Sequence, residues 1–126
     1  MNHNYSVWGT VESIVAAYKI MDENGNIVPD LESQVIVRRM LTALRRFFFD
    51  NGLLTVTAFD NDGNLIDRHY YRNDFTVEGI ELLKHKEAAW LRSKAAKKIP
   101  PDMKILEKEL IKIRTLMTEG ATRSST

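Results

Sequence analysis

A chain of 126 residues is about one domain and is long enough to bury a hydrophobic core. Hydrophobic residues make up 44% and charged residues 28%, as in ordinary globular proteins, and a formal net charge of +1 gives no bulk attraction to nucleic acid or membranes. The absence of cysteine excludes disulfides, thiolate nucleophiles and cysteine metal sites.

These properties lead us to expect a cytoplasmic protein that does not associate with membranes. A cysteine-free composition fits a reducing compartment. The first residues contain no basic segment followed by an apolar one, and no stretch approaches the roughly 18 uninterrupted apolar residues of a membrane span.

The N-terminal segment 7–21 predicts a helix, because its apolar residues recur at helical spacing. These residues are Val7, Val11, Ile14, Val15, Tyr18 and Met21. A rival interpretation comes from DENGNIV at 22–28, which echoes DNDGNLI at 60–66 and would place a second β-hairpin here. The helix is favoured, since Val11 and Val15 lose their place in an alternating scheme.

The segment 31–50 predicts a long amphipathic helix. Asp30 is a suitable N-cap, and Asn51-Gly52 is a suitable C-terminal stop. One apolar stripe would face the core, formed by Val37, Met40, Leu41, Leu44, Phe47 and Phe48.

The segment 53–71 predicts an antiparallel hairpin with strands 53–59 and 65–71. Its three-residue loop ends at Gly63, which can adopt the left-handed conformation without steric cost, and this sets Phe59 opposite Leu65. The strand residues then separate into an apolar face with Leu54, Val56, Ala58, Ile66 and Tyr70 and a polar face with Thr55, Thr57, Asp67 and His69.

The Asp, Asn and Gly residues of 22–26 and 60–64 raise calcium binding as an interpretation. In an EF-hand loop with Gly63 at position six, however, Ala58 would occupy position one and His69 position twelve, where oxygen ligands are required. Turn formation explains both clusters without a metal, so we predict turns.

Two further helices are predicted downstream, at 77–98 with Thr76 as N-cap and from Met103 to about Thr118. The Pro100-Pro101 pair separates them, and they should pack as an antiparallel pair. Residues 1–119 would form one globular domain, followed by a flexible tail at 120–126. The expected fold class is α+β, with three to four amphipathic helices packed on the hairpin.

No motif in the sequence predicts catalysis, a cofactor or a metal. Nucleophile elbows, phosphate loops, dinucleotide fingerprints and H-E-x-x-H are all missing, and His3, His69 and His85 lack the spacing of metal ligands. We therefore predict a protein that is not an enzyme.

Charged and aromatic residues suggest a partner-binding surface instead. Four arginines form two i, i+7 pairs beside the apolar stripe of the helix at 31–50, and three consecutive phenylalanines cannot all face one core. The candidate partner-binding residues are Arg38, Arg39, Arg45, Arg46, Phe49, Asp67, His69 and Tyr71.

The function expected from this pattern is a non-catalytic protein-binding module, most concretely an immunity- or antitoxin-type inhibitor of a toxin or effector. One alternative is a nucleic-acid-associated regulator that uses the basic helix faces. Another is a phage-type or structural assembly factor that forms a homodimer through the 53–71 hairpin edge or the terminal helix.

Overall fold

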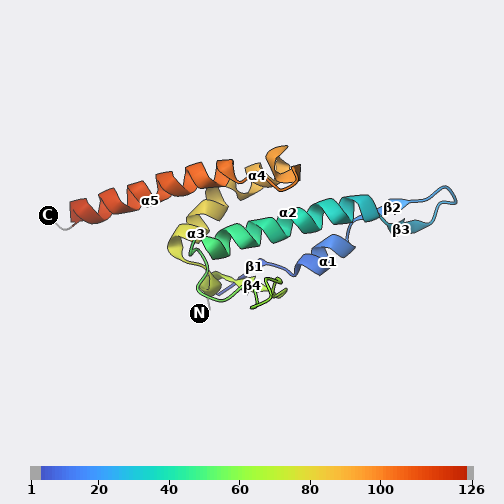
Figure 1. The fold of residues 1–126 in the computed structure, drawn as a ribbon, viewed down its shortest axis with the longest axis horizontal. Helices are drawn as coiled ribbons and strands as arrows, with labels where there is room; N and C mark the ends of the chain where they lie inside the picture. Colours follow the sequence, from blue (N-terminus) through green and yellow to red (C-terminus); the bar gives the residue numbers. More distant parts are fainter. Residues whose placement is uncertain (1–3, 125–126) are drawn as a thin grey trace.

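The structure, a computed structural model, describes the backbone of residues 4–124 and the side chains of residues 4–120. The elements in chain order are β1 (Ser6–Trp8), α1 (Val11–Ala16), β2 (Lys19–Met21), β3 (Ile27–Pro29), α2 (Leu31–Asp50), β4 (Tyr70–Tyr71), η1 (Arg72–Asp74), α3 (Val77–Leu82), η2 (Leu83–Glu87), α4 (Ala88–Arg92), η3 (Ala95–Lys97) and α5 (Lys104–Ser124). Helices pack with small two-stranded antiparallel sheets, so the predicted α+β class is confirmed (Figure 1).

The predicted central helix is confirmed as α2, and its local signals act as expected. The Asp30 side chain accepts a hydrogen bond from the backbone N–H of Ser33, and Gly52 follows the helix at φ 68°. Leu44 and Phe48 are almost fully buried in the main core, which also contains Leu53 and Trp90.

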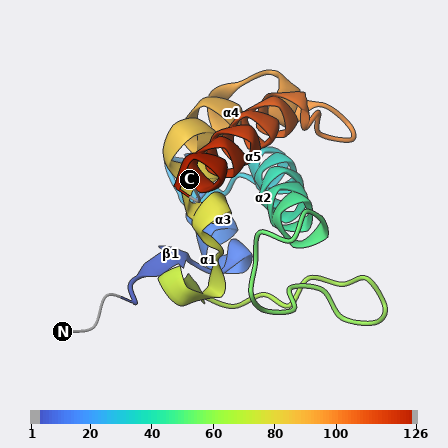
Figure 2. The same cartoon turned by 90° about the vertical axis from the view of Figure 1, so that its left-hand side faces the viewer.

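The predicted antiparallel pair of C-terminal helices is also present. In Figure 1, α5 runs back beside α3 and α4, and Figure 2, which looks along α5, places α2 and α3 next to it. The π-helical turn η2 joins α3 to α4. Trp90 is fully buried in α4, and its indole N–H donates to the carbonyl of Asp102 at 2.9 Å.

The predicted bounds of these two helices are wrong. The helix expected to reach residue 98 ends at Arg92, because Ser93 is extended and its hydroxyl donates to the Trp90 carbonyl at 2.7 Å. The last helix continues past Thr118 to Ser124, since no proline interrupts it. The flexible tail expected at 120–126 lies partly outside the described residues and stays a prediction.

The hairpin predicted at 53–71 is confirmed only next to its turn. Phe59 pairs with Leu65, and the Ile66 N–H donates to the Ala58 carbonyl at 2.8 Å. Away from the turn the predicted register is wrong, because the chain segments separate and take other partners. Leu54 bridges to Phe75, and β4 pairs with β1.

The pairing of β1 with β4 has a physical reason in the aromatic core. It places the Trp8 ring in edge-on contact with Phe48, Tyr70 and Phe75, at centroid distances of 5.1, 5.8 and 4.8 Å. Such edge-on pairs add to the free energy gained by burial. The regular hairpin would leave Trp8 without this strand partner.

The helix predicted at 7–21 is wrong over most of its length. Only Val11–Ala16 is helical, with Val11 and Val15 buried, and the rival hairpin interpretation is correct for 19–29. Thr10 caps α1, and Asp67 accepts hydrogen bonds from the backbone N–H groups of Val11 and Glu12 at 2.7 and 3.1 Å.

The two Asp-containing turns share one geometry, which confirms the turn interpretation. In each, the Asp side chain (Asp22 or Asp60) accepts from the backbone N–H groups two and four residues later, at 2.8 or 2.9 Å. Gly25 and Gly63 adopt φ angles of 81° and 82°, a region that favours glycine.

Candidate functional site

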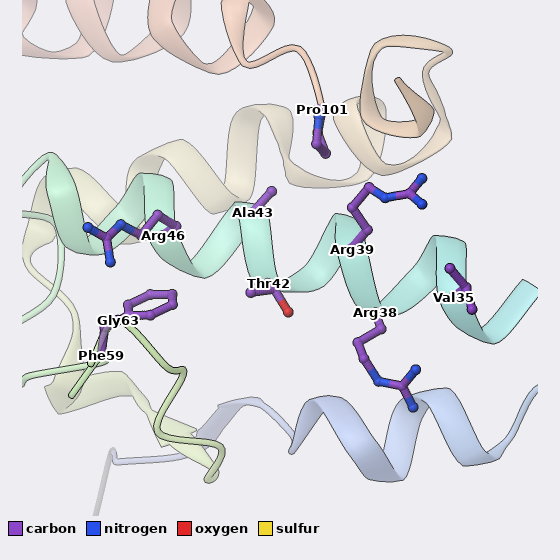
Figure 3. A pocket seen from close by; sticks show the side chains of 9 residues that line it. All are labelled: Val35, Arg38, Arg39, Thr42, Ala43, Arg46, Phe59, Gly63 and Pro101. Atoms are coloured by element: carbon purple, nitrogen blue, oxygen red, sulfur yellow. The ribbon is translucent and has the colours of Figure 1, made fainter. Parts of the chain in front are cut away.

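An open groove of about 660 Å³ runs along the outer face of α2. Its walls come from three parts of the chain: α2, the turn after Phe59 and the loop at Pro101 (Figure 3). The lining residues are Val35, Arg38, Arg39, Thr42, Ala43, Arg46, Phe59, Gly63 and Pro101. We call this surface the arginine groove.

Helical spacing explains why α2 supplies most of the groove. Val35, Arg39 and Ala43 follow one another at intervals of four residues, and Arg46 lies three residues further on. These positions share one face of the helix, away from the stripe buried in the core. Three of the four arginines predicted to bind a partner therefore meet at one surface.

Two of these arginines form ion pairs with carboxylates of the same chain. Arg38 donates from Nε and a terminal nitrogen to both oxygens of Glu12, at 2.8 and 2.9 Å. This hydrogen bonding lowers the pKa of Glu12 and raises that of Arg38. Arg46 lies 3.1 Å from Asp50.

Arg39 differs from both, since it makes no ion pair with any residue in the described part of the chain. Of the three arginines that line the groove, it is the one without a carboxylate partner among the described residues.

The Phe59 ring closes one end of the groove. The guanidinium of Arg46 lies 4.8 Å from the centroid of the Phe59 ring, and Phe49 packs against the same ring at 5.8 Å. Phe49 is only half-buried, so its predicted role at an interface stays a prediction. The end of the groove thus combines a cation with apolar surface.

Arg45, the fourth predicted arginine, lies in the interior and is not available on the surface. Only 1% of it is exposed, its guanidinium lies 4.6 Å from the Trp8 ring centroid, and it donates to the carbonyls of Gly9 and Leu41. Burial lowers the pKa of Arg45, opposed by the charge of Asp67. The i, i+7 spacing did not reveal this, because the covering Trp8 comes from a distant strand.

The predicted residues of the 53–71 segment do not line the groove. Asp67 is engaged in capping α1. His69 and Tyr71 are exposed and stack on each other at 6.3 Å, with the Ser6 hydroxyl 3.5 Å from His69 Nδ1. Their predicted part in partner binding stays a prediction, at a surface separate from the groove lining.

Sequence reasoning missed an exposed apolar surface on the β2–β3 hairpin. We call residues 19–29 the arm; it projects beyond the start of α2 (Figure 1). Ile20, Met21 and Ile27 are 53%, 63% and 62% exposed. The echo of the 60–66 turn at 22–28 had raised this hairpin as the rival interpretation, but it gave no sign that the apolar side chains would be exposed.

Sequence reasoning also missed a half-buried carboxylate. Glu87 lines a second, more enclosed cavity of about 440 Å³ between α1, α2 and α4. Its carboxylate accepts from the Trp8 indole N–H at 2.8 Å, and burial raises the pKa of Glu87. Arg45 lines the same cavity, so a carboxylate and a guanidinium both contact one tryptophan.

No group of three or more acidic or histidine side chains in the described part of the chain is arranged to hold a metal ion. Within residues 4–124, no helix has both the length and the apolar character needed to cross a membrane. Comparisons with protein-family models, with curated protein sequences and with solved structures find no match.

Proposed function

We propose that this chain is a non-catalytic protein-binding module, and that the arginine groove is its binding surface. The observation that carries the proposal is Arg39, a cation without a carboxylate partner among the described residues, set in an open groove with apolar walls. A partner that fits would present a carboxylate beside apolar side chains.

The charges around the groove favour protein over nucleic acid. Arg38 is neutralised by Glu12 and Arg46 lies beside Asp50, so two of the three cations are already offset. Phosphate backbones are bound by several uncompensated cations together. Protein interfaces instead combine single arginine anchors with aromatic and apolar contacts, as at Arg46 and Phe59.

Affinity capture with a tagged chain tests the proposal, followed by mass spectrometry of what is retained. Arg39→Glu should lose the partner that the wild type retains. Lys112→Glu is the matched control, since it makes the same charge change at an exposed position on α5 outside the groove, and it should retain the partner. Equal retention by Arg39→Glu would contradict the proposal.

The narrower form of the proposal is an immunity- or antitoxin-type inhibitor of a cytoplasmic toxin or effector. Co-expression with the product of a neighbouring gene tests it, with co-purification as the expected result. Salt-sensitive retention on heparin that is lost in Arg39→Glu would support the nucleic-acid alternative instead.

A further inference from the structure

We propose that the partner in the arginine groove is a second copy of this chain, and that each copy places its arm in the groove of the other. Glu23 at the tip of the arm would pair with Arg39. This inference rests on the proposed function, because it names the occupant of the same groove.

The arm is poorly supported within its own chain. Its strands have three residues each, and an isolated two-stranded hairpin is marginally stable in water. Near its base, the Tyr18 carbonyl accepts from the Asp30 N–H and from the Gln34 side chain, both at 3.0 Å. Both faces of the arm carry exposed apolar side chains, so the arm gains stability when another surface covers it.

The charges of the arm and the groove are complementary. The Asp22 carboxylate is occupied by two backbone N–H groups of its own turn. The Glu23 side chain makes no hydrogen bond or ion pair within the described residues, and the same is true of Arg39. The arm therefore offers one unpaired carboxylate, and the groove offers one unpaired guanidinium.

The apolar surfaces of the arm and the groove also match. Met21 and Ile27 flank the acidic tip of the arm, and apolar side chains flank Arg39 in the groove. The exposed apolar surface of the arm joins that of the groove through Leu31 and Val35, which are 69% and 52% exposed and lie one helical turn apart.

The dimensions allow both arms to bind at once. The arm from residue 19 to 23 covers at most about 13 Å, at 3.3 Å per residue. The helix from Val35 to Arg46 spans about 16 Å at 1.5 Å per residue. The arm leaves one end of α2 and the groove follows the same helix, so a twofold axis across α2 would bring each arm over the partner's groove.

A charge-exchange experiment on the full chain tests this dimer. Light scattering across a concentration series should show a dimer for the wild type, and Glu23→Arg and Arg39→Glu should each weaken dimerisation by tenfold or more. The double variant should recover most of that loss, because the pair is restored in reverse. Glu107→Arg on α5 is the matched control and should dimerise as the wild type does.

Thiol cross-linking gives a second measurement, made simple because the chain has no cysteine of its own. A chain carrying Glu23→Cys and Arg39→Cys should be joined into a covalent dimer by a short bismaleimide, which spans the longer gap that a Glu–Arg pair leaves between backbones, whereas Glu107→Cys with Arg39→Cys should remain monomeric under the same conditions.

A wild type that stays monomeric at all concentrations, or a dimer indifferent to Glu23→Arg, would overturn the inference. If Arg39→Glu still abolished capture of a different protein, the proposed function would survive the failure of the dimer.

Discussion

The buried side chains of Trp8 and Arg45 form a cluster of polar contacts with the half-buried Glu87. The Arg45 guanidinium lies over the Trp8 ring, and the Trp8 indole N–H donates to Glu87. Burial works against both charges, since it raises the pKa of Glu87 and lowers that of Arg45. Replacing one charge should therefore change how stability depends on pH.

Glu87→Gln is the first prediction. Folded protein holds a proton on Glu87 at pH values where the unfolded chain has released it. The free energy of unfolding therefore falls as the pH rises from about 4.5, the ordinary pKa, through the raised folded-state pKa. Gln keeps an acceptor for Trp8 but cannot ionise.

Urea denaturation at pH 4 and pH 7 checks this prediction. The stability of Glu87→Gln relative to the wild type should increase between the two pH values. If the difference in free energy of unfolding between the two proteins were the same at both pH values, ionisation of Glu87 would not destabilise the folded protein.

At the scale of the elements, a close approach joins α3 to the chain that leaves α2. A Cβ added at Gly79 would lie 2.7 Å from the Leu53 carbonyl oxygen, which also accepts from the Thr76 N–H at 2.9 Å. The oxygen belongs to the backbone and cannot rotate away. A side chain here would push α3 off its packing position.

Gly79→Ala should therefore destabilise the protein by about 1–3 kcal/mol, the usual cost of overpacking. Helix propensity alone predicts the opposite, a gain of up to about 1 kcal/mol. Gly120→Ala in α5 is the control, because its Cβ would meet nothing within 4 Å and should not destabilise. Urea denaturation compares the variants. A stabilised Gly79→Ala protein would contradict the close packing.

The elements that could be predicted from the sequence are those whose signals are local. One stretch of chain contains the Asp30 cap, the apolar stripe of α2 and the stop at Gly52. Each of the two Asp-containing turns, at 22–26 and 60–64, depends on five consecutive residues. The α2 positions of the groove could be predicted for the same reason.

Long-range pairing could not be predicted in this way. The choice between a regular hairpin and a β1–β4 pair depended on Trp8 meeting rings that are distant in sequence. Similarly, Phe59 and Pro101 both line the groove, although they are far apart in the sequence and lie outside α2. The arm was the less favoured alternative, because the apolar residues of 14–20 alternate acceptably but Val11 and Val15 fit only the helix.

At the scale of the whole molecule, Trp8 connects the N-terminal strand to the rest of the domain. It is 5% exposed and contacts rings from α2, β4 and the Phe75 segment. It is also the hydrogen-bond donor to Glu87. Loss of the indole should therefore weaken the aromatic packing and also remove the hydrogen-bond donor to the Glu87 carboxylate.

Trp8→Phe should lower the free energy of unfolding by about 1–3 kcal/mol, because it leaves the Glu87 carboxyl without its donor. In the double variant with Glu87→Leu, part of the loss should be recovered, since no carboxylate is then left without its donor. Thermal denaturation of both single variants and of the double variant measures the coupling, and strict additivity of the two single effects would contradict it.

The π turn η2 has a consequence for the position of the groove. A π turn contains one residue more than an α turn, and each residue of an α-helix advances the chain by about 100°. If residues 83–87 formed a regular α turn instead, α4 would therefore rotate by about 100° and carry Trp90 out of phase with the core. The Trp90 indole N–H donates to the carbonyl of Asp102, and Pro101, the preceding residue, forms one wall of the groove. The π turn between α3 and α4 thus helps to set the shape of the arginine groove, which lies mainly on α2.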